Sequence, residues 1–224
     1  CVQNLKSGEI AVIAGKGHEK TQDFCEKKIF FSDRQEILRS INFKNKFLFK
    51  DLKLNIIEEI SGKNLSKNII IKNAHINSRE IEKDDIFFAI KGKKKNGNKF
   101  AFEAVKKGAS LTIVNQTNNM YSSAKQINVK DTLGFLTKCS SIYRDNVKSK
   151  IIAITGSCGK TTLKEMLGNT LKKISRASCS PKSYNNKYGV PLSLFNLKEQ
   201  DNFGVFEVGM DKKGEIDNLT KIIK

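Results

Sequence analysis

One segment constrains the fold more than any other: residues 151–162 read Ile-Ile-Ala-Ile-Thr-Gly-Ser-Cys-Gly-Lys-Thr-Thr. The apolar start predicts a buried strand at Ile151–Thr155, and the glycines predict a turn at Gly156–Gly159. Apolar residues then recur at helical spacing as far as Ile174, so a helix is expected to begin at Lys160. A strand, a glycine turn and a helix in this order are typical of a phosphate-binding loop.

The residue types in this loop suit a nucleotide and magnesium. Backbone N–H groups at the start of the helix meet phosphate oxygens, and glycine permits their close approach. Lys160 is expected to neutralise the β and γ phosphates, and the Thr161 hydroxyl to ligate Mg²⁺. The predicted ATP contacts are Gly156, Ser157, Cys158, Gly159, Lys160, Thr161 and Thr162.

A second strand, predicted at Val205–Val208, carries Glu207 near its carboxyl end. Open α/β sheets present their ligand groups at this end of the strands. A carboxylate oxygen is a ligand that Mg²⁺ prefers, so Glu207 is expected to hold the metal opposite Thr161. Taken alone, a glutamate at a strand end is more often a surface residue, but the neighbouring phosphate loop favours the metal site.

The remaining sequence alternates strands and helices, which indicates an α/β fold. We predict three parts: residues 1–44, 45–148 and 149–224. The third is a parallel-sheet domain that is too short to complete a doubly wound sheet. The other expected strands are 10–14, 29–31, 68–72, 85–90 and 111–114, and the other expected helices are 34–41, 99–107, 132–143 and 214–223. Residues 42–54 are expected to be a linker.

Composition limits the classes of partner. The 224 residues carry a net charge of +18, but the lysines are spread along the whole chain, which favours a solvated surface over nucleic-acid binding. Five cysteines without metal-ligand spacing and two distant histidines favour a reducing cytoplasm, and Cys158 is interpreted as a variable loop residue rather than a redox switch. The sequence has no apolar stretch long enough to predict a membrane-spanning helix, so membrane insertion is not expected. The absence of an initiator methionine suggests a fragment.

Three motifs in order resemble the Mur ligase family. They are Ile154–Thr162, then Tyr184-Asn185-Asn186 with Gly189–Leu192, then Phe206–Met210 with Gly214-Glu215-Ile216. The closest resemblance is to the branch that joins D-Ala-D-Ala to UDP-MurNAc-tripeptide. The resemblance implies an ATP-binding role for Lys160, and for Asn185 and Asn186 a role in orienting the substrate or the γ phosphate.

The region before this domain also resembles that branch, through Asn77-Ser78-Arg79 and the stretch 85–92. In the family this small α/β domain holds the UDP part of the substrate. The resemblance therefore implies that Ser78 and Arg79 contact the nucleotide of UDP-MurNAc-peptide.

Residues 8–41 resemble a different branch, the one that adds diaminopimelate as the third amino acid. The similarity lies in Gly15-Lys-Gly-His-Glu19, with Gln22 and Phe31–Arg34 after it. It implies that Gly15 and Glu19 contact the added amino acid, and that residues 1–44 are the tail of a Rossmann-like domain preceding the small domain.

The resemblance implies a monomeric ligase in which a substrate carboxylate attacks the γ phosphate of ATP and an amine then displaces phosphate. Catalytic roles fall to Lys160, Asn185, Asn186 and Glu207, with Thr161 and Glu207 as metal ligands. Three alternatives stay open: the folylpolyglutamate synthetase branch, a P-loop ATPase that binds nucleic acid, and a non-catalytic nucleotide-binding fragment.

Overall fold

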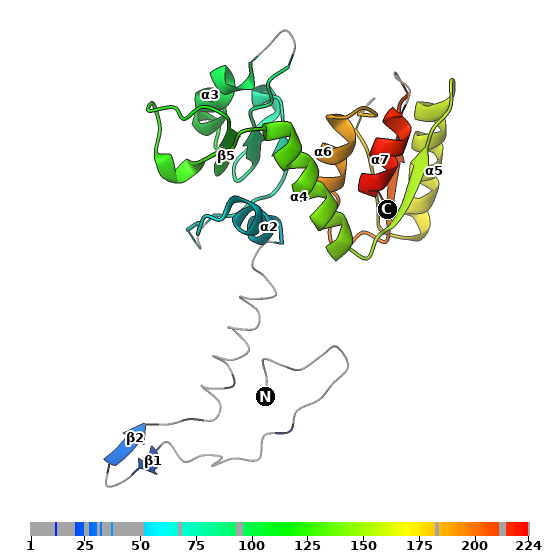
Figure 1. The fold of residues 1–224 in the computed structure, drawn as a ribbon. Coiled ribbons are helices and arrows are strands. Elements are labelled where there is room, and N and C mark those ends of the chain that lie inside the picture. Colours follow the sequence, from blue (N-terminus) through cyan, green and yellow to red (C-terminus); the bar gives the residue numbers. More distant parts are fainter. Residues whose placement is uncertain are drawn as a thin grey trace. The chain divides into compact units, whose positions relative to one another are not determined.

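The computed structural model describes residues 52–66, 69–92, 96–181, 184–210 and 214–223, with residues 12, 21–24, 27–30, 32 and 37 of the first part. Residue contacts divide the chain into two compact units, Cys1–Asp51 and Leu52–Lys224. Figure 1 shows the course of the chain and the labelled elements.

The described part of the first unit contains an antiparallel pair of strands, β1 (Thr21–Phe24) and β2 (Lys27–Phe30). The strand expected at 29–31 corresponds to β2. Ile37, inside the helix expected at 34–41, is helical. The strand expected at 10–14 lies outside the described residues except for Val12, which is not in a strand, and Gly15 and Glu19 also lie outside them.

The second unit begins with a four-stranded parallel sheet in the order β3-β4-β5-β6. Its strands are β3 (Ala74–His75), β4 (Ile86–Phe88), β5 (Leu111–Val114) and β6 (Gln126–Asn128), and its helices are α2 (Leu52–Ser61), α3 (Ala101–Lys106) and α4 (Thr132–Asn146). Alternation along β4 directs Phe87 into the cluster of α3, and Ile86 and Phe88 into the larger core with α2 and α4.

Two expectations for this region are wrong. The strand predicted at 68–72 is absent from its described residues, 69–72, because the Lys72 N–H donates to the Asp84 carbonyl instead of entering the sheet. Parallel pairing begins at Ala74. The linker predicted as far as residue 54 overlaps α2, whose apolar side chains Ile56 and Ile57 are buried.

The second sheet has three parallel strands in the order β7-β9-β8. They are β7 (Lys150–Ile154), β8 (Ala177–Cys179) and β9 (Phe203–Glu207), joined by α5 (Lys160–Ile174) and α6 (Gly189–Phe195) and followed by α7 (Glu215–Ile223). Val205 packs in the cluster that contains Leu171 of α5, whereas Phe206 packs in the larger core with α6. The parallel α/β architecture agrees with the fold expected from the sequence.

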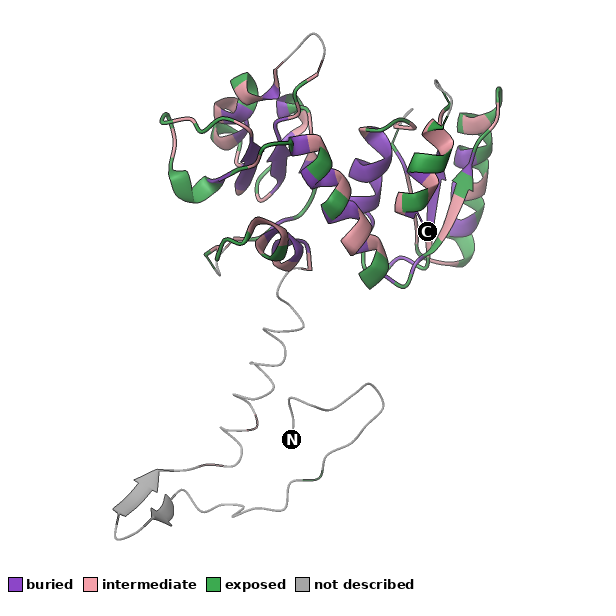
Figure 2. Cartoon of the chain, viewed as in Figure 1, coloured by how far each residue is buried: buried purple, intermediate pink, exposed green. Residues whose placement is uncertain are grey.

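Helix α6 joins the two sheets. All seven of its residues are buried, as Figure 2 shows. The Phe195 ring meets Phe88 of β4 edge-on at 6.1 Å and Tyr143 of α4 at 5.5 Å between centroids. Beyond the helix, the Asn196 amide accepts a hydrogen bond from the Ala74 N–H at 2.6 Å and donates one to its carbonyl at 2.8 Å.

Composition had suggested that the lysines lie on a solvated surface, but two lysines in the described residues do not. Lys53 and Lys164 are buried, and the Lys53 ammonium donates to the Lys72 carbonyl at 2.6 Å. Among the described residues, no helix is long and apolar enough to cross a membrane.

Candidate active site

The loop between β7 and α5 adopts a conformation that depends on its glycines. Gly156 has φ 144°, and Gly159, which precedes the first residue of α5, has φ 76°. Side chains disfavour this region of φ, so glycine is required at both positions. The loop thereby delivers the first turn of α5, whose N–H groups have no partner within a helix, to the carboxyl end of β7.

Lys160, the first residue of α5, extends across this loop. Its ammonium donates to the Gly156 carbonyl at 2.5 Å and to the Ser157 carbonyl at 3.3 Å. Four neighbouring residues are exposed to solvent: Ser157, Cys158, Thr161 and Thr162. The charge of Lys160 therefore lies where an anion bound by the loop would be neutralised.

Glu207, at the end of β9, is only 2% exposed and forms the centre of the site. Its carboxylate accepts hydrogen bonds from the Thr161 hydroxyl at 2.7 Å and from the Asn185 amide at 2.9 Å. Its backbone N–H donates to the Ser180 hydroxyl at 3.2 Å. Two side chains that are distant in sequence, Thr161 and Asn185, thus converge on one buried carboxylate, and the structure brings Thr161 and Glu207 together.

Two glycines allow Asn185 to reach Glu207. The Gly209 N–H donates to the Asn185 carbonyl at 2.6 Å, and a Cβ at Gly209 would lie 3.0 Å from that oxygen. A Cβ at Gly189 would lie 2.5 Å from the Cα of Tyr184. The glycines of the second and third motifs are therefore packing requirements of the site.

Asn186 has a different environment from Asn185. Its side-chain oxygen accepts hydrogen bonds from the N–H groups of Tyr188 and Gly189, both at 3.0 Å. These bonds organise the start of α6. Among the described residues, the Asn186 side chain has no hydrogen bond with Glu207, whereas that of Asn185 has one. A direct role in orienting a substrate remains a prediction for Asn186.

Ser78 and Arg79 lie just after β3, in the 3-10 turn Ser78–Glu80. The Ser78 hydroxyl donates to Glu103 at 3.0 Å, and Asn77 caps the turn by accepting from the Arg79 N–H at 3.2 Å. Ser78 is buried and Arg79 is exposed. The two predicted residues therefore share a turn, in which only the arginine side chain is open to solvent.

Sequence reasoning missed two contacts near the site. Ser180 had no distinguishing motif, although it is buried and holds the backbone of Glu207. The Tyr184 hydroxyl donates to Glu80 at 3.5 Å. This bond links the residue before Asn185 to the turn after β3. Burial and the negative charge of Glu80 raise the pKa of Tyr184. Only the Tyr-Asn-Asn motif gave a signal for this tyrosine.

No cluster of three or more His, Cys, Asp or Glu side chains suited to a metal occurs in the described ranges. A magnesium site of the kind expected here needs fewer protein ligands, since Mg²⁺ keeps several waters and shares phosphate oxygens. The Thr161 hydroxyl and the Glu207 carboxylate, 2.7 Å apart, fit that requirement.

Two family models match the chain in succession. The model of the Mur ligase family catalytic domain matches residues 70–155, and that of the Mur ligase middle domain matches residues 154–224. The chain belongs to the Mur ligase family. The second model begins at Ile154 and thus covers the phosphate loop, Asn185 and Glu207, whereas the first covers Ser78 and Arg79.

Curated relatives include the UDP-N-acetylmuramoyl-tripeptide--D-alanyl-D-alanine ligases of Rickettsia prowazekii and Haemophilus influenzae. The first is 32% identical over 163 residues, which cover 73% of this chain and 36% of the relative. The second is 33% identical over 162 residues, which cover 70% of this chain and 35% of the relative. The chain therefore spans about a third of the length of these relatives.

Solved structures agree with this assignment. MurF from Acinetobacter baumannii is similar with a TM-score of 0.63 and 32% identity, over 75% of this chain and 38% of that one. MurF from Thermotoga maritima in complex with ADP is similar with a TM-score of 0.58 and 32% identity, over 70% of this chain and 36% of that one. The chain is thus a MurF-like member of the family.

The site predicts an order of thiol reactivity. Among the three cysteines in the described residues, iodoacetamide should alkylate the exposed Cys158 first and the buried Cys139 last, with Cys179 between them. Burial raises the pKa of the Cys139 and Cys179 thiols, so less of the reactive thiolate is present at pH 8, and their rates should rise as the pH increases. Peptide mass spectrometry over time measures each site separately.

The variant Cys158→Ser should lose only the fast site, and unfolding in urea should equalise the three rates. Equal alkylation of Cys139 and Cys158 in the native protein would contradict the burial described for Cys139.

Proposed function

We propose that this chain contributes the nucleotide-binding region of an ATP-dependent, amide-forming ligase of peptidoglycan precursor synthesis. The observation that carries the proposal is the convergence of Thr161 and Asn185 on the buried Glu207, beside Lys160. The arrangement pairs a hydroxyl with a carboxylate, and the ammonium of Lys160, the residue before Thr161, lies across the phosphate loop. Phosphoryl transfer depends mainly on positioning and on neutralising charge, which these groups supply.

In the proposed complex, ATP binds along the loop Gly156–Gly159 and the first turn of α5. The N–H groups there bind phosphate oxygens, and Lys160 moves from the Gly156 carbonyl to the β and γ phosphates. Thr161 and Glu207 would hold Mg²⁺, which would supply Lewis acidity to the phosphates. Asn185 fixes the orientation of the Glu207 carboxylate through its 2.9 Å hydrogen bond.

The proposed reaction has two steps. A carboxylate oxygen of the substrate attacks the γ phosphorus of ATP, the bond to ADP breaks, and an acyl phosphate forms. The amine of the second substrate then attacks the acyl carbon, the carbon–oxygen bond to phosphate breaks, and an amide forms as the amine loses a proton. The relatives' names support UDP-MurNAc-tripeptide and D-Ala-D-Ala as the two substrates.

We assign the substrate-binding parts by their position in the chain. Residues 45–148 are proposed as the UDP-substrate-binding part, in which the exposed Arg79 contacts the nucleotide and the buried Ser78 lies in the same turn. Residues 149–224 are proposed as the ATP-binding part. The contact of Tyr184 with Glu80 supports communication between the two regions of the substrate path. We propose a monomeric, cytoplasmic parent enzyme.

We further propose that residues 1–44 derive from the tail of a diaminopimelate-adding ligase, with Gly15 and Glu19 contacting the amino acid. The support is the motif Gly15–Glu19, which lies outside the described residues. If the junction is genuine, cells that make this protein should contain one polypeptide whose peptide map includes both residues 1–44 and residues 52–224. Recovery of the two sets of peptides only from separate polypeptides would refute it.

Nucleotide binding by this chain tests the first part of the proposal. Lys160→Ala should weaken ATP binding at least tenfold, because a charge-assisted contact is worth about 1.5–3 kcal/mol. Glu207→Gln keeps the shape of the side chain, so ATP alone should still bind, but the gain in affinity from added Mg²⁺ should be lost. Isothermal titration calorimetry with and without Mg²⁺ measures both effects.

Two exposed residues provide matched controls. Lys173→Ala removes a lysine from the last turn of the same helix, and Glu199→Gln neutralises an exposed glutamate; both should bind ATP and Mg²⁺ as the parent chain does. Equal losses in the site variants and the controls would remove the support for the proposed roles.

Phosphate release by the full-length parent enzyme tests the reaction. Release from ATP and Mg²⁺ should require UDP-MurNAc-tripeptide and D-Ala-D-Ala together and should be lost in Lys160→Ala. This chain alone, which spans about a third of its relatives' length, should bind nucleotide without completing the reaction. Release that depends on nucleic acid instead of both substrates would favour a P-loop ATPase of another class.

A further inference from the structure

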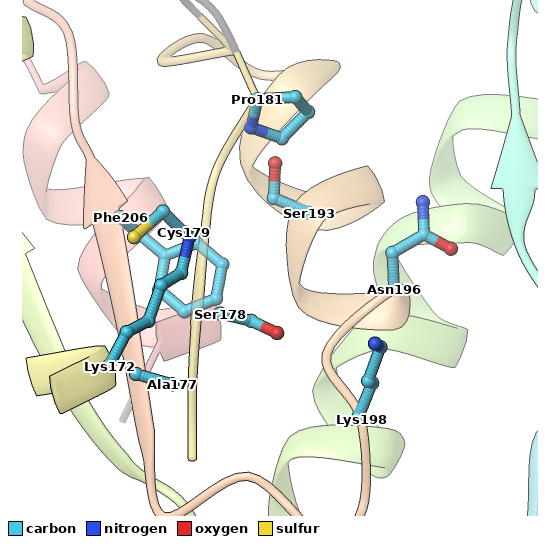
Figure 3. Close-up of a pocket in the computed structure, with 9 residues that line it drawn as sticks. All are labelled: Lys172, Ala177, Ser178, Cys179, Pro181, Ser193, Asn196, Lys198 and Phe206. Carbon is cyan, nitrogen blue, oxygen red and sulfur yellow. The ribbon is translucent and has the colours of Figure 1, made fainter. Parts of the chain in front are cut away.

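A cavity of about 320 Å³ lies beside β8, on the edge of the second sheet. Figure 3 shows its lining residues, which come from the end of α5, from β8 with Pro181 after it, from α6 with the segment after it, and from Phe206 of β9. None of the residues that form the phosphate loop or the Glu207 cluster lines this cavity. Its volume is near the lower end of the range for small-molecule sites, roughly 300–1,000 Å³.

The hydroxyl of Ser193 is the feature that points to a ligand. Ser193 lies in α6, lines the cavity and is 5% exposed. Its oxygen is the one buried side-chain polar atom without a hydrogen-bond partner among the described residues. In contrast, the hydroxyl of Ser140, another buried helical serine, lies 2.7 Å from each of the Leu136 and Pro191 carbonyl oxygens and has its one proton available to either. An unpartnered buried hydroxyl is unfavourable unless a ligand or a water molecule bonds it, so a ligand that enters the cavity gains a hydrogen bond there.

The charges around the cavity favour an anion. Lys172 reaches it from the last turn of α5 and Lys198 from the segment after α6, and no acidic side chain is among its lining residues. Two carboxylates lie near the lining residues. Asp201 accepts hydrogen bonds from the Ser178 hydroxyl and from the Lys198 N–H, and the charge of Glu165 acts on the Cys179 thiol, where the charges of Lys172 and Lys164 oppose it. Asp201 is itself buried, and its interactions hold β8 and the lysine segment in place.

The other lining residues limit the shape of the ligand. The Phe206 ring, Pro181 and Ala177 provide apolar surface, and Asn196 is already engaged by both backbone groups of Ala74. We propose that this cavity binds a small organic anion, with its carboxylate or phosphate between Lys172 and Lys198, a hydrogen bond to Ser193, and a compact apolar body against Phe206. The site is independent of the proposed ligase reaction.

Cys179 lines the cavity and reports on its occupancy. With Lys160→Ala as the background, to exclude binding to the phosphate loop, benzoate and phenyl phosphate are the probes and benzyl alcohol is the uncharged control. Either anion should slow iodoacetamide alkylation of Cys179 at least threefold and leave the rate at Cys158 unchanged. Comparing the two anions identifies whether a carboxylate or a phosphate is preferred.

Variants at the cavity separate binding from folding. Ser193→Ala and Lys172→Gln should each weaken anion binding, measured by calorimetry, about tenfold, as expected for loss of one charge-assisted contact. Ser193→Ala should leave the melting temperature unchanged or raise it, because it removes an unpartnered hydroxyl. Lys173→Gln, one residue from Lys172, is the matched control and should bind as before.

The proposal is overturned if neither anion protects Cys179 at concentrations up to about 10 mM, or if benzyl alcohol protects it equally. Protection that persists fully in Ser193→Ala and Lys172→Gln would also overturn it. Each of these results is independent of ATP binding, so failure here leaves the proposed ligase function intact.

Discussion

The buried carboxylate of Glu207 is the constraint on which the arrangement of the site depends. A charge that is 2% exposed is costly to remove from water unless hydrogen-bond donors replace the water. The donors are the Thr161 hydroxyl from α5 and the Asn185 amide from the segment before α6. Meeting this requirement fixes the ends of β7 and β9, the start of α5 and the Tyr184–Asn185 segment relative to one another. The phosphate loop is therefore held in place by the same group that we propose as a metal ligand.

Helix α6 extends this organisation to the first sheet. Its amino end is set by Asn186, close to Glu207 through Asn185, and its carboxyl end places Phe195 between Phe88 and Tyr143. The following Asn196 bonds both backbone groups of Ala74 in β3. Because β3 leads into the turn that contains Ser78 and Arg79, one short buried helix connects the proposed UDP-binding turn with the proposed ATP site.

The sequence predicted best those elements whose chemistry leaves few alternatives. The phosphate loop needs glycine at positions 156 and 159. In α5 apolar residues recur at helical spacing along its whole length, and the observed bounds of the helix agree with the predicted ones. The strand β5 is likewise as predicted. Short elements were missed: β6, β8 and α6 have three to seven residues, too few for a period to be evident. Ser180 and the partner of Tyr184 could not be found, because nothing local marks a contact across 27 or 104 residues.

Lysine shows most clearly why composition alone was insufficient. A chain rich in lysine was expected to carry these residues on a solvated surface, yet Lys53, in the first turn of α2, is buried. Its ammonium donates to the Lys72 carbonyl and lies 5.9 Å from the Tyr143 ring centroid and 5.7 Å from that of Phe195. Aromatic faces attract a cation and offset part of its lost hydration. The same aromatic pair that joins α4 to α6 therefore also holds α2, and the position of one lysine depends on side chains 90 and 142 residues away, beyond the reach of any local pattern.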